Sequence, residues 1–309
     1  MLRKYFLPAL AALVILTGTA CSESQEQTGN NGDTTSDNDP NLAADSVLTP
    51  FGRFHKDHVH QHPEGSVITN NEDSTTTVTS PDGTEKTVTA GASSGMTQAS
   101  PSEASSSDGL PVKHAYINWA RFVTPDGVEV GTYNANYIVP GSPPDSTDQT
   151  LYYFTGLEDP DSDPFVILQP VLGFNQGIGW NISSWNCCPD GQPHQANVVT
   201  GMVPGDTIFT SMVKSGSSYT ITSTWKGQSS VLTVNTGSEK FNWPNASLEV
   251  YRLNSCSQTA VGPMTFFDMV MLDTEGNPIS MDWDVDGNDS VCNTRLTLVD
   301  ATTITIEQN

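Results

Sequence analysis

The chain has few basic residues. Its 309 residues include 12 Lys and Arg against 35 Asp and Glu, which gives a net charge of −23 and a pI near 4.2. A field of this sign repels phosphate backbones and anionic lipids, so the composition argues against a nucleic-acid-binding protein. Beyond the N-terminus no apolar run reaches the roughly 18 residues of a membrane-spanning helix. No stretch carries a sustained helical stripe either, and a mostly β protein remains.

Familiar catalytic motifs are also missing. The sequence contains no Gly-x-Ser-x-Gly and no His-Glu-x-x-His. After residue 110 the only histidines are His114 and His194, which argues against a Ser-His-Asp triad. Glu158 with Asp159 or Asp161 could still face a groove as the carboxylate pair of a glycoside hydrolase.

The N-terminus predicts export. Arg3 and Lys4 precede the apolar residues 5–16, so residues 1–20 are predicted to be a signal peptide. Small residues before Cys21 resemble a bacterial lipoprotein processing site, which predicts lipidation of Cys21. The protein would then be a cell-envelope lipoprotein that contacts the membrane only through its N-terminal lipid. Cleavage by ordinary signal peptidase, giving a secreted protein, is the alternative.

Four cysteines remain after Cys21, and an even number in an oxidising compartment predicts two disulfides. A ring between the adjacent Cys187 and Cys188 is strained, so each is expected to pair separately with Cys256 or Cys292, in an order that the sequence leaves open. A zinc site is the rival, but no second cysteine pair or nearby histidine completes its spacing.

Residues 21–110 are predicted to be a low-complexity, lipid-anchored tether, polar over 22–50 and rich in Ser, Gly and Ala over 90–110. Within it, residues 51–90 hold a short hairpin, because Thr and Val alternate over 75–89 around a Pro-Asp-Gly turn. This part could equally be a propeptide or a spacer.

Four histidines, His55, His58, His60 and His62, lie just before the predicted hairpin. The last three would share one face of an extended strand and could bind Zn²⁺ or Cu²⁺. The alternative is a solvated segment that becomes cationic below about pH 6. The sequence leaves the role of this cluster open.

Residues 111–309 predict one all-β domain, a concanavalin-like sandwich of two antiparallel sheets. Short runs of period-two alternation, separated by turn signals, indicate its strands. These runs are 133–139, 151–154, 165–168, 180–185, 208–213, 219–225, 229–234, 248–253, 264–272 and 295–306.

Several segments, in order, resemble the eqolisin-type glutamic peptidases over about residues 115–275. They are Gly131–Pro140, Tyr152–Asp159, Phe165–Gln169, Trp180–Trp185, Pro204–Ile208, Leu248–Tyr251 and Gly262–Phe266. The resemblance implies a sandwich of two antiparallel sheets and an endopeptidase that cleaves polypeptides at acid pH without a cofactor. It places the catalytic pair at Gln169 and Glu249.

One Glu and one Gln suffice to hydrolyse a peptide bond without a metal ion or a covalent intermediate. A carboxylate can take a proton from water and deliver it to the leaving amine, while a glutamine amide donates to the developing oxyanion. Tyr152, Trp180 and Trp185 would supply the aromatic walls of the substrate cleft. Val250 departs from the family pattern, which has Trp after the catalytic Glu, as do residues 183–188.

A non-catalytic module is the alternative function. Aromatic side chains stack on sugars as readily as on peptides, so the domain could be a lectin-like or adhesive module that binds a cell-surface glycan. Leu248 and Val250 are expected to face the core. If the domain is not catalytic, Glu249 is an ordinary solvated strand residue. Gln169, before Pro170, then merely ends a strand. A third hypothesis is a purely structural protein of the cell envelope.

One acidic segment has the spacing of a calcium loop. Asp282, Asp284 and Asp286 precede Gly287 as in D-x-D-x-D-G, which predicts a structural calcium ion. The twelfth position is Asn293 rather than Glu, and an acidic turn between strands is the alternative.

Overall fold

The computed structural model describes residues 46–71, 73, 75–89, 113–162, 166–175, 177–237, 239–286 and 291–308. The predicted signal peptide, Cys21 and the polar stretches 22–45 and 90–112 lie outside these residues. Within them, no helix has the length and apolar character needed to cross a membrane.

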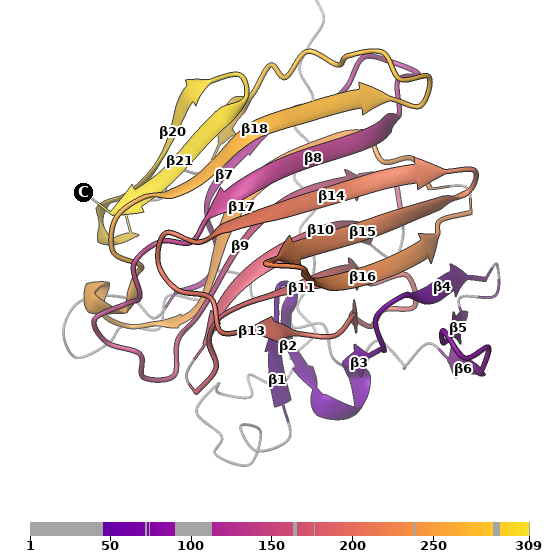
Figure 1. The fold of residues 1–309 in the computed structure, drawn as a ribbon, viewed down its shortest axis with the longest axis horizontal. Helices are drawn as coiled ribbons and strands as arrows, with labels where there is room; N and C mark the ends of the chain where they lie inside the picture. The colour runs from indigo at the N-terminus through magenta and orange to yellow at the C-terminus, as the bar shows by residue number, and fades with distance from the viewer. Residues whose placement is uncertain are drawn as a thin grey trace, which may run out of the picture. The chain divides into compact units, whose positions relative to one another are not determined.

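Two large sheets make up the fold (Figure 1). The first runs in the order β19 (Asp284–Asp286), β7 (Lys113–Arg121), β17 (Trp243–Leu253), β9 (Thr150–Asp159), β10 (Val166–Asn175), β11 (Gly179–Cys187), β12 (His194–Gln195) and β3 (His60–Gln61), with β13 (Val199–Thr200) also on β11. The second runs β20 (Thr294–Asp300), β21 (Thr303–Gln308), β18 (Met264–Asp273), β8 (Val130–Ile138), β14 (Thr207–Ser215), β15 (Ser218–Trp225), β16 (Gln228–Asn235), β4 (Ser66–Asn70), β5 (Thr75–Thr79) and β6 (Glu85–Thr89).

The two sheets pack face to face, which confirms the predicted all-β sandwich. β10 lies against β14 and β15, and β11 against β15 and β16. Alternate residues of each strand point into the shared core, among them Tyr137, Leu168, Leu248 and Ile221, all at most 2% exposed. Leu248 and Val250 therefore face the core as expected. The period-two alternation that predicts the strands is the consequence of this one-sided burial.

The predicted hairpin over 75–89 is confirmed as β5 and β6. The segment around it differs from a tether, however. β4 pairs in parallel with β16, and β3 pairs in parallel with β12. Residues 46–89 are thus part of the same compact unit as the sandwich, which spans residues 41–309. The buried Ile68 and Val78 explain why, since they complete the apolar core at its edge.

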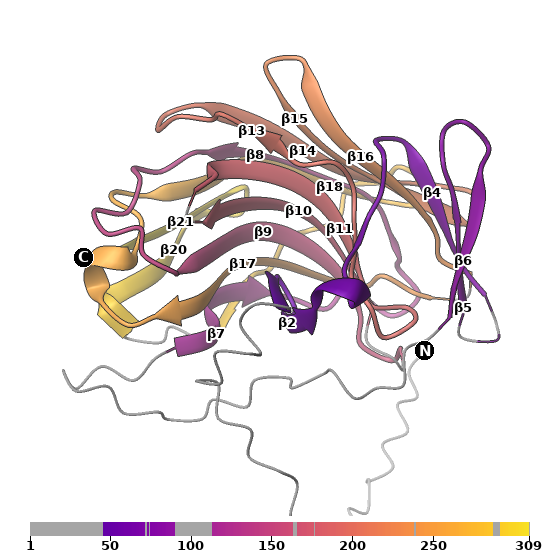
Figure 2. The same ribbon diagram turned by 90° about the horizontal axis from the view of Figure 1, so that it is seen from below.

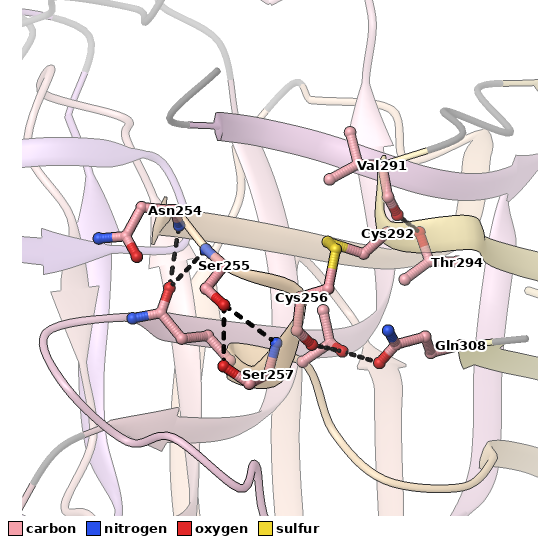
Figure 3. The surroundings of a disulfide bond; sticks show 10 residues. Asn254, Ser255, Cys256, Ser257, Val291, Cys292, Thr294 and Gln308 are labelled. Atoms are coloured by element: carbon pink, nitrogen blue, oxygen red, sulfur yellow. Dashed lines mark hydrogen bonds between the residues drawn. A yellow bond between two sulfur atoms is a disulfide. The ribbon is translucent and has the colours of Figure 1, made fainter. Parts of the chain in front are cut away.

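The expected cysteine pairing is wrong. Cys187 and Cys188 are bonded to each other across a cis peptide bond, with Cα atoms 3.1 Å apart. Cys256 is bonded to Cys292, with Cα atoms 5.1 Å apart (Figure 3). The physical reason is location: the first pair lies on the outer face of the first sheet, whereas the second lies in or beside the core between the sheets.

Candidate functional site

The first sheet is curved, and its concave outer face carries the candidate site (Figure 2). Alternation sends the even-numbered residues of β9 and the odd-numbered residues of β10, β11 and β17 to this face. A second apolar cluster lies there, separate from the core: Phe54, Tyr152, Phe154, Ile167, Val171, Trp185, Cys187, Cys188 and Tyr251. Glu249 of β17 and Gln169 of β10 are both odd-numbered, so their side chains point to this same face.

Glu249 is buried rather than solvated. It is 3% exposed, and burial raises its pKa well above the usual range, opposed by a hydrogen bond from the Tyr251 hydroxyl to Oε1. Its Oε2 has no hydrogen-bond partner among the described residues. Burial therefore favours the neutral form of this carboxyl over the carboxylate.

Gln169 lies within β10 and does not end it. It is fully buried; its side chain interacts with the Tyr116 hydroxyl, and neither amide atom forms a well-aligned hydrogen bond among the described residues. Asn118 and Asn186 have both amide atoms in the same condition, so what distinguishes Gln169 is its position on the face that carries Glu249.

β9 separates the two residues. Glu249 pairs with Tyr152 of β9, while Gln169 is level with Gly156, four residues along the same strand. Four residues span about 13 Å of strand. Tyr116 of β7 pairs with Glu249, and its phenol faces both Glu249 and Gln169. Burial, and then the nearby Glu249, raise the pKa of Tyr116, so it stays a neutral hydroxyl between them.

The predicted aromatic walls are only partly on this face. Tyr152 and Trp185 belong to the outer cluster. Trp180 does not: it packs in the core, with its ring 5.0 Å from that of Phe174 and 6.1 Å from that of Tyr153. Its assignment to the cleft is wrong, because residues five apart on a strand point to opposite faces. That alternation was readable in the sequence.

A second carboxylate shares the face. Glu158 of β9 accepts a hydrogen bond from Asn245 of β17. Burial raises its pKa to about 7, against the attraction of Arg121. Asn245, Tyr116 and Tyr251 did not stand out in the sequence, although the odd-residue register of β17 places Asn245 and Tyr251 on the same face as Glu249.

The N-terminal segment covers this face. β1 (Ser46–Thr49) and β2 (Gly52–His55) form a hairpin, and Figure 2 shows β2 beneath the arch of β9, β10 and β17. Leu48, Phe51, Phe54 and Val59 pack on the outer cluster. The Tyr152 hydroxyl donates to the Leu48 carbonyl at 2.9 Å, and the Phe51 ring meets that of Trp185 edge-on at 6.2 Å.

His58, His60 and His62 do not form the predicted row on one face of a strand. His58 lies in a short 3-10 turn, Lys56–His58, whereas His60 and His62 stack on His194 with ring centroids 5.1 and 5.3 Å away. Among the described residues, no group of three His, Cys, Asp or Glu side chains is arranged to hold a metal ion.

The calcium prediction finds no support either. The side chains of Asp282 and Asp284 form no metal-binding group within the described part of the chain. The side chain of Asp286 and residues 287–290 lie outside that part. Ser280 donates to Asp282, and Asp284 belongs to β19, which pairs with β7, so this segment is an edge strand of the first sheet.

The chain is similar to three solved structures of glutamic peptidases. Scytalido-glutamic peptidase with a transition state analog inhibitor is 17% identical, with a TM-score of 0.48, over 64% of this chain and 100% of that one. The same enzyme with a peptide-based analog is 18% identical (TM-score 0.46, 63% and 100%). SCP-B, a member of the eqolisin family in complex with the tripeptide Ala-Ile-His, is 18% identical (TM-score 0.45, 63% and 100%). No protein-family model and no curated protein matches the chain.

Proposed function

We propose that the protein is a glutamic-type endopeptidase that hydrolyses polypeptides at acid pH, with Glu249 and Gln169 as its catalytic pair. The observation that carries this proposal is that Glu249 and Gln169 are buried on one face of one sheet and both face the Tyr116 phenol, while Oε2 of Glu249 has no hydrogen-bond partner among the described residues. Unpaired buried polar groups cost stability, about 1–3 kcal/mol each. A site that binds water and a peptide carbonyl would use them.

Each group has a distinct role in the proposed reaction. Glu249 takes a proton from the attacking water and returns it to the leaving amine. Gln169 Nε2 donates to the oxyanion that develops on the scissile carbonyl. The Tyr251 hydroxyl orients the carboxyl of Glu249. Burial favours the neutral acid, whereas taking a proton from water requires the carboxylate, so activity should change as Glu249 titrates.

The proposal includes the cellular setting expected from the N-terminus. An exported protein, anchored through a lipid on Cys21, would hold the sandwich at the cell envelope and meet polypeptide substrates outside the cytoplasm. Palmitate labelling of the full chain expressed in a bacterial host, lost in Cys21→Ala, is the expected result. Unchanged labelling in that variant would contradict it.

The test of activity uses the full chain with a denatured protein as substrate between pH 3 and 7, and new amino termini are counted by mass spectrometry. We expect Glu249→Gln and Gln169→Met each to lower kcat by at least about 100-fold. Glu249→Gln keeps the shape of the side chain and Gln169→Met keeps its length without buried polar atoms, so both variants should fold.

Glu239→Gln is the matched control. Glu239 is also a largely buried carboxyl, with a pKa that burial raises to about 7, but it bonds Asn70 of β4 outside the candidate site. Its variant should cleave like the wild type. Cleavage by Glu249→Gln at the wild-type rate would refute the catalytic role, and a folded wild type that binds glycans without cleaving protein would favour the lectin-like alternative.

A further inference from the structure

A cluster of three buried or half-buried imidazoles joins the N-terminal segment to the sandwich, and the proposed reaction does not use it. His60 lies in β3 and His62 directly follows that strand, whereas His194 comes from β12. The backbone amides of His60 and His62 donate to the carbonyls of Pro193 and Gln195, at 3.0 and 2.7 Å. The cluster lies directly after the hairpin that covers the candidate site.

The hydrogen bonds of the cluster suit neutral imidazoles. His194 Nε2 lies 3.1 Å from Asp190 Oδ2, and both side chains are fully buried. With the carboxylate as acceptor, His194 Nε2 donates, which leaves Nδ1 as an acceptor for His62 Nε2 at 3.0 Å. His60 Nε2 donates to Gln192 Oε1 at 2.8 Å. A proton added to His62 places a positive charge beside the rings of His60 and His194.

We propose that residues 46–62 are a cover that closes the candidate site at neutral pH and swings off it in acid, with His60, His62 and His194 as its latch. Closure is the arrangement described above, in which Leu48, Phe51 and Phe54 occupy the face that carries Glu249 and Gln169. Release would leave β4 to β6 in place, because β4 is held by β16 and not by the cluster.

Electrostatics give the direction of the switch. Burial, and then the neighbouring His194, His60 and Lys86, lower the pKa of His62 to about 3, with only Asp190 acting in the opposite sense. Burial, against the hydrogen bond to Gln192, lowers the pKa of His60. A histidine whose pKa is lowered in the closed state favours opening once the pH falls below its free value of about 6.5.

The size of the effect follows from the same linkage. Closure is unaffected above about pH 6.5 and weakens progressively between pH 6.5 and 3. For His62 alone, the ratio of closed to open molecules should fall on the order of 100-fold between pH 7.5 and 4.5. The window coincides with the acid conditions proposed for hydrolysis. That regulatory meaning rests on the proposed function, whereas the opening itself does not.

The experiment measures hydrogen-exchange protection, corrected for intrinsic rates, in the full chain at pH 7.5 and 4.5. We expect amides of residues 46–55 to lose protection on the order of 100-fold in acid, with β4 and β8 still protected. His62→Phe keeps an aromatic ring that cannot be protonated, so most of this loss should disappear. His58→Gln, outside the cluster, should behave like the wild type.

Two results would overturn the proposal. One is equal protection of residues 46–55 at both pH values in the wild type; the other is a wild-type loss of protection in His62→Phe. If the cover of His62→Phe is already unprotected at pH 7.5, NMR titration of the wild-type His62 ring replaces this comparison. A His62 pKa at the free value of about 6.5, with residues 46–55 still protected, would contradict the latch. Opening without any peptide hydrolysis would refute the peptidase and retain the latch.

Discussion

The hydrogen bond from Tyr251 to Glu249 sets the acidity of the proposed general acid at the scale of one residue. It opposes the effect of burial on the pKa of Glu249, so Tyr251→Phe should raise that pKa further. The infrared band of the protonated Glu249 carboxyl, identified by its loss in Glu249→Gln, should then persist to higher pH. Tyr153→Phe is the control, since Tyr153 points into the core from the same region of β9. A band that titrates unchanged in Tyr251→Phe would contradict the assigned contact.

Alternation along the strands predicted which way a side chain points, but not what covers it. The sequence predicted that Leu248 and Val250 face the core and that Glu249 faces away from it, and the structure confirms this alternation. The burial of Glu249 was not, because it depends on Tyr251 of its own strand and on a hairpin some 200 residues earlier in the chain. Phe51 and Phe54, two aromatic residues in a polar stretch, were the signal available for that hairpin.

At the scale of elements, the Cys256–Cys292 disulfide ties the short helix Cys256–Gln258 to the turn Val291–Asn293 before β20 (Figure 3). It closes a loop of 36 residues, and loop-closure entropy for that length corresponds to about 4 kcal/mol. The double variant Cys256→Ala, Cys292→Ala should therefore lower the free energy of unfolding by about that amount, measured by urea titration. An unchanged midpoint would show that the connection is dispensable.

Most strands could be predicted from the sequence, whereas the pairing of strands far apart in the chain could not. Short alternating runs predicted β8, β9, β11 and β14 to β18, and the Thr-Val repeat predicted the β5–β6 hairpin. No local pattern indicates that β4 pairs in parallel with β16, about 165 residues later, because strand pairing is decided by which edges remain open. The vicinal pairing of Cys187 with Cys188 was missed in the same way, since the positions of the other cysteines depend on the whole fold.

At the scale of the whole molecule, buried acids and buried histidines give opposite responses to pH. Burial raises the pKa of Glu158 and Glu239 to about 7, so their contribution to stability is full below about pH 4.5 and is lost as the pH rises through 7. Each could account for roughly 3 kcal/mol between those limits. Lower pH also reduces the self-repulsion of a chain with a net charge of −23. The sandwich should therefore become more stable over the range in which the cover opens.

Calorimetry of the full chain should accordingly give a higher Tm at pH 5 than at pH 8, while residues 46–55 lose exchange protection over the same interval. Glu158→Gln and Glu239→Gln should each flatten the dependence of Tm on pH, because a glutamine amide does not titrate. His62→Phe should leave that dependence almost unchanged and alter only the protection of the cover. A Tm that falls together with the protection from pH 8 to pH 5 would mean that acid loosens the whole sandwich, and the cover would then not be an independent switch.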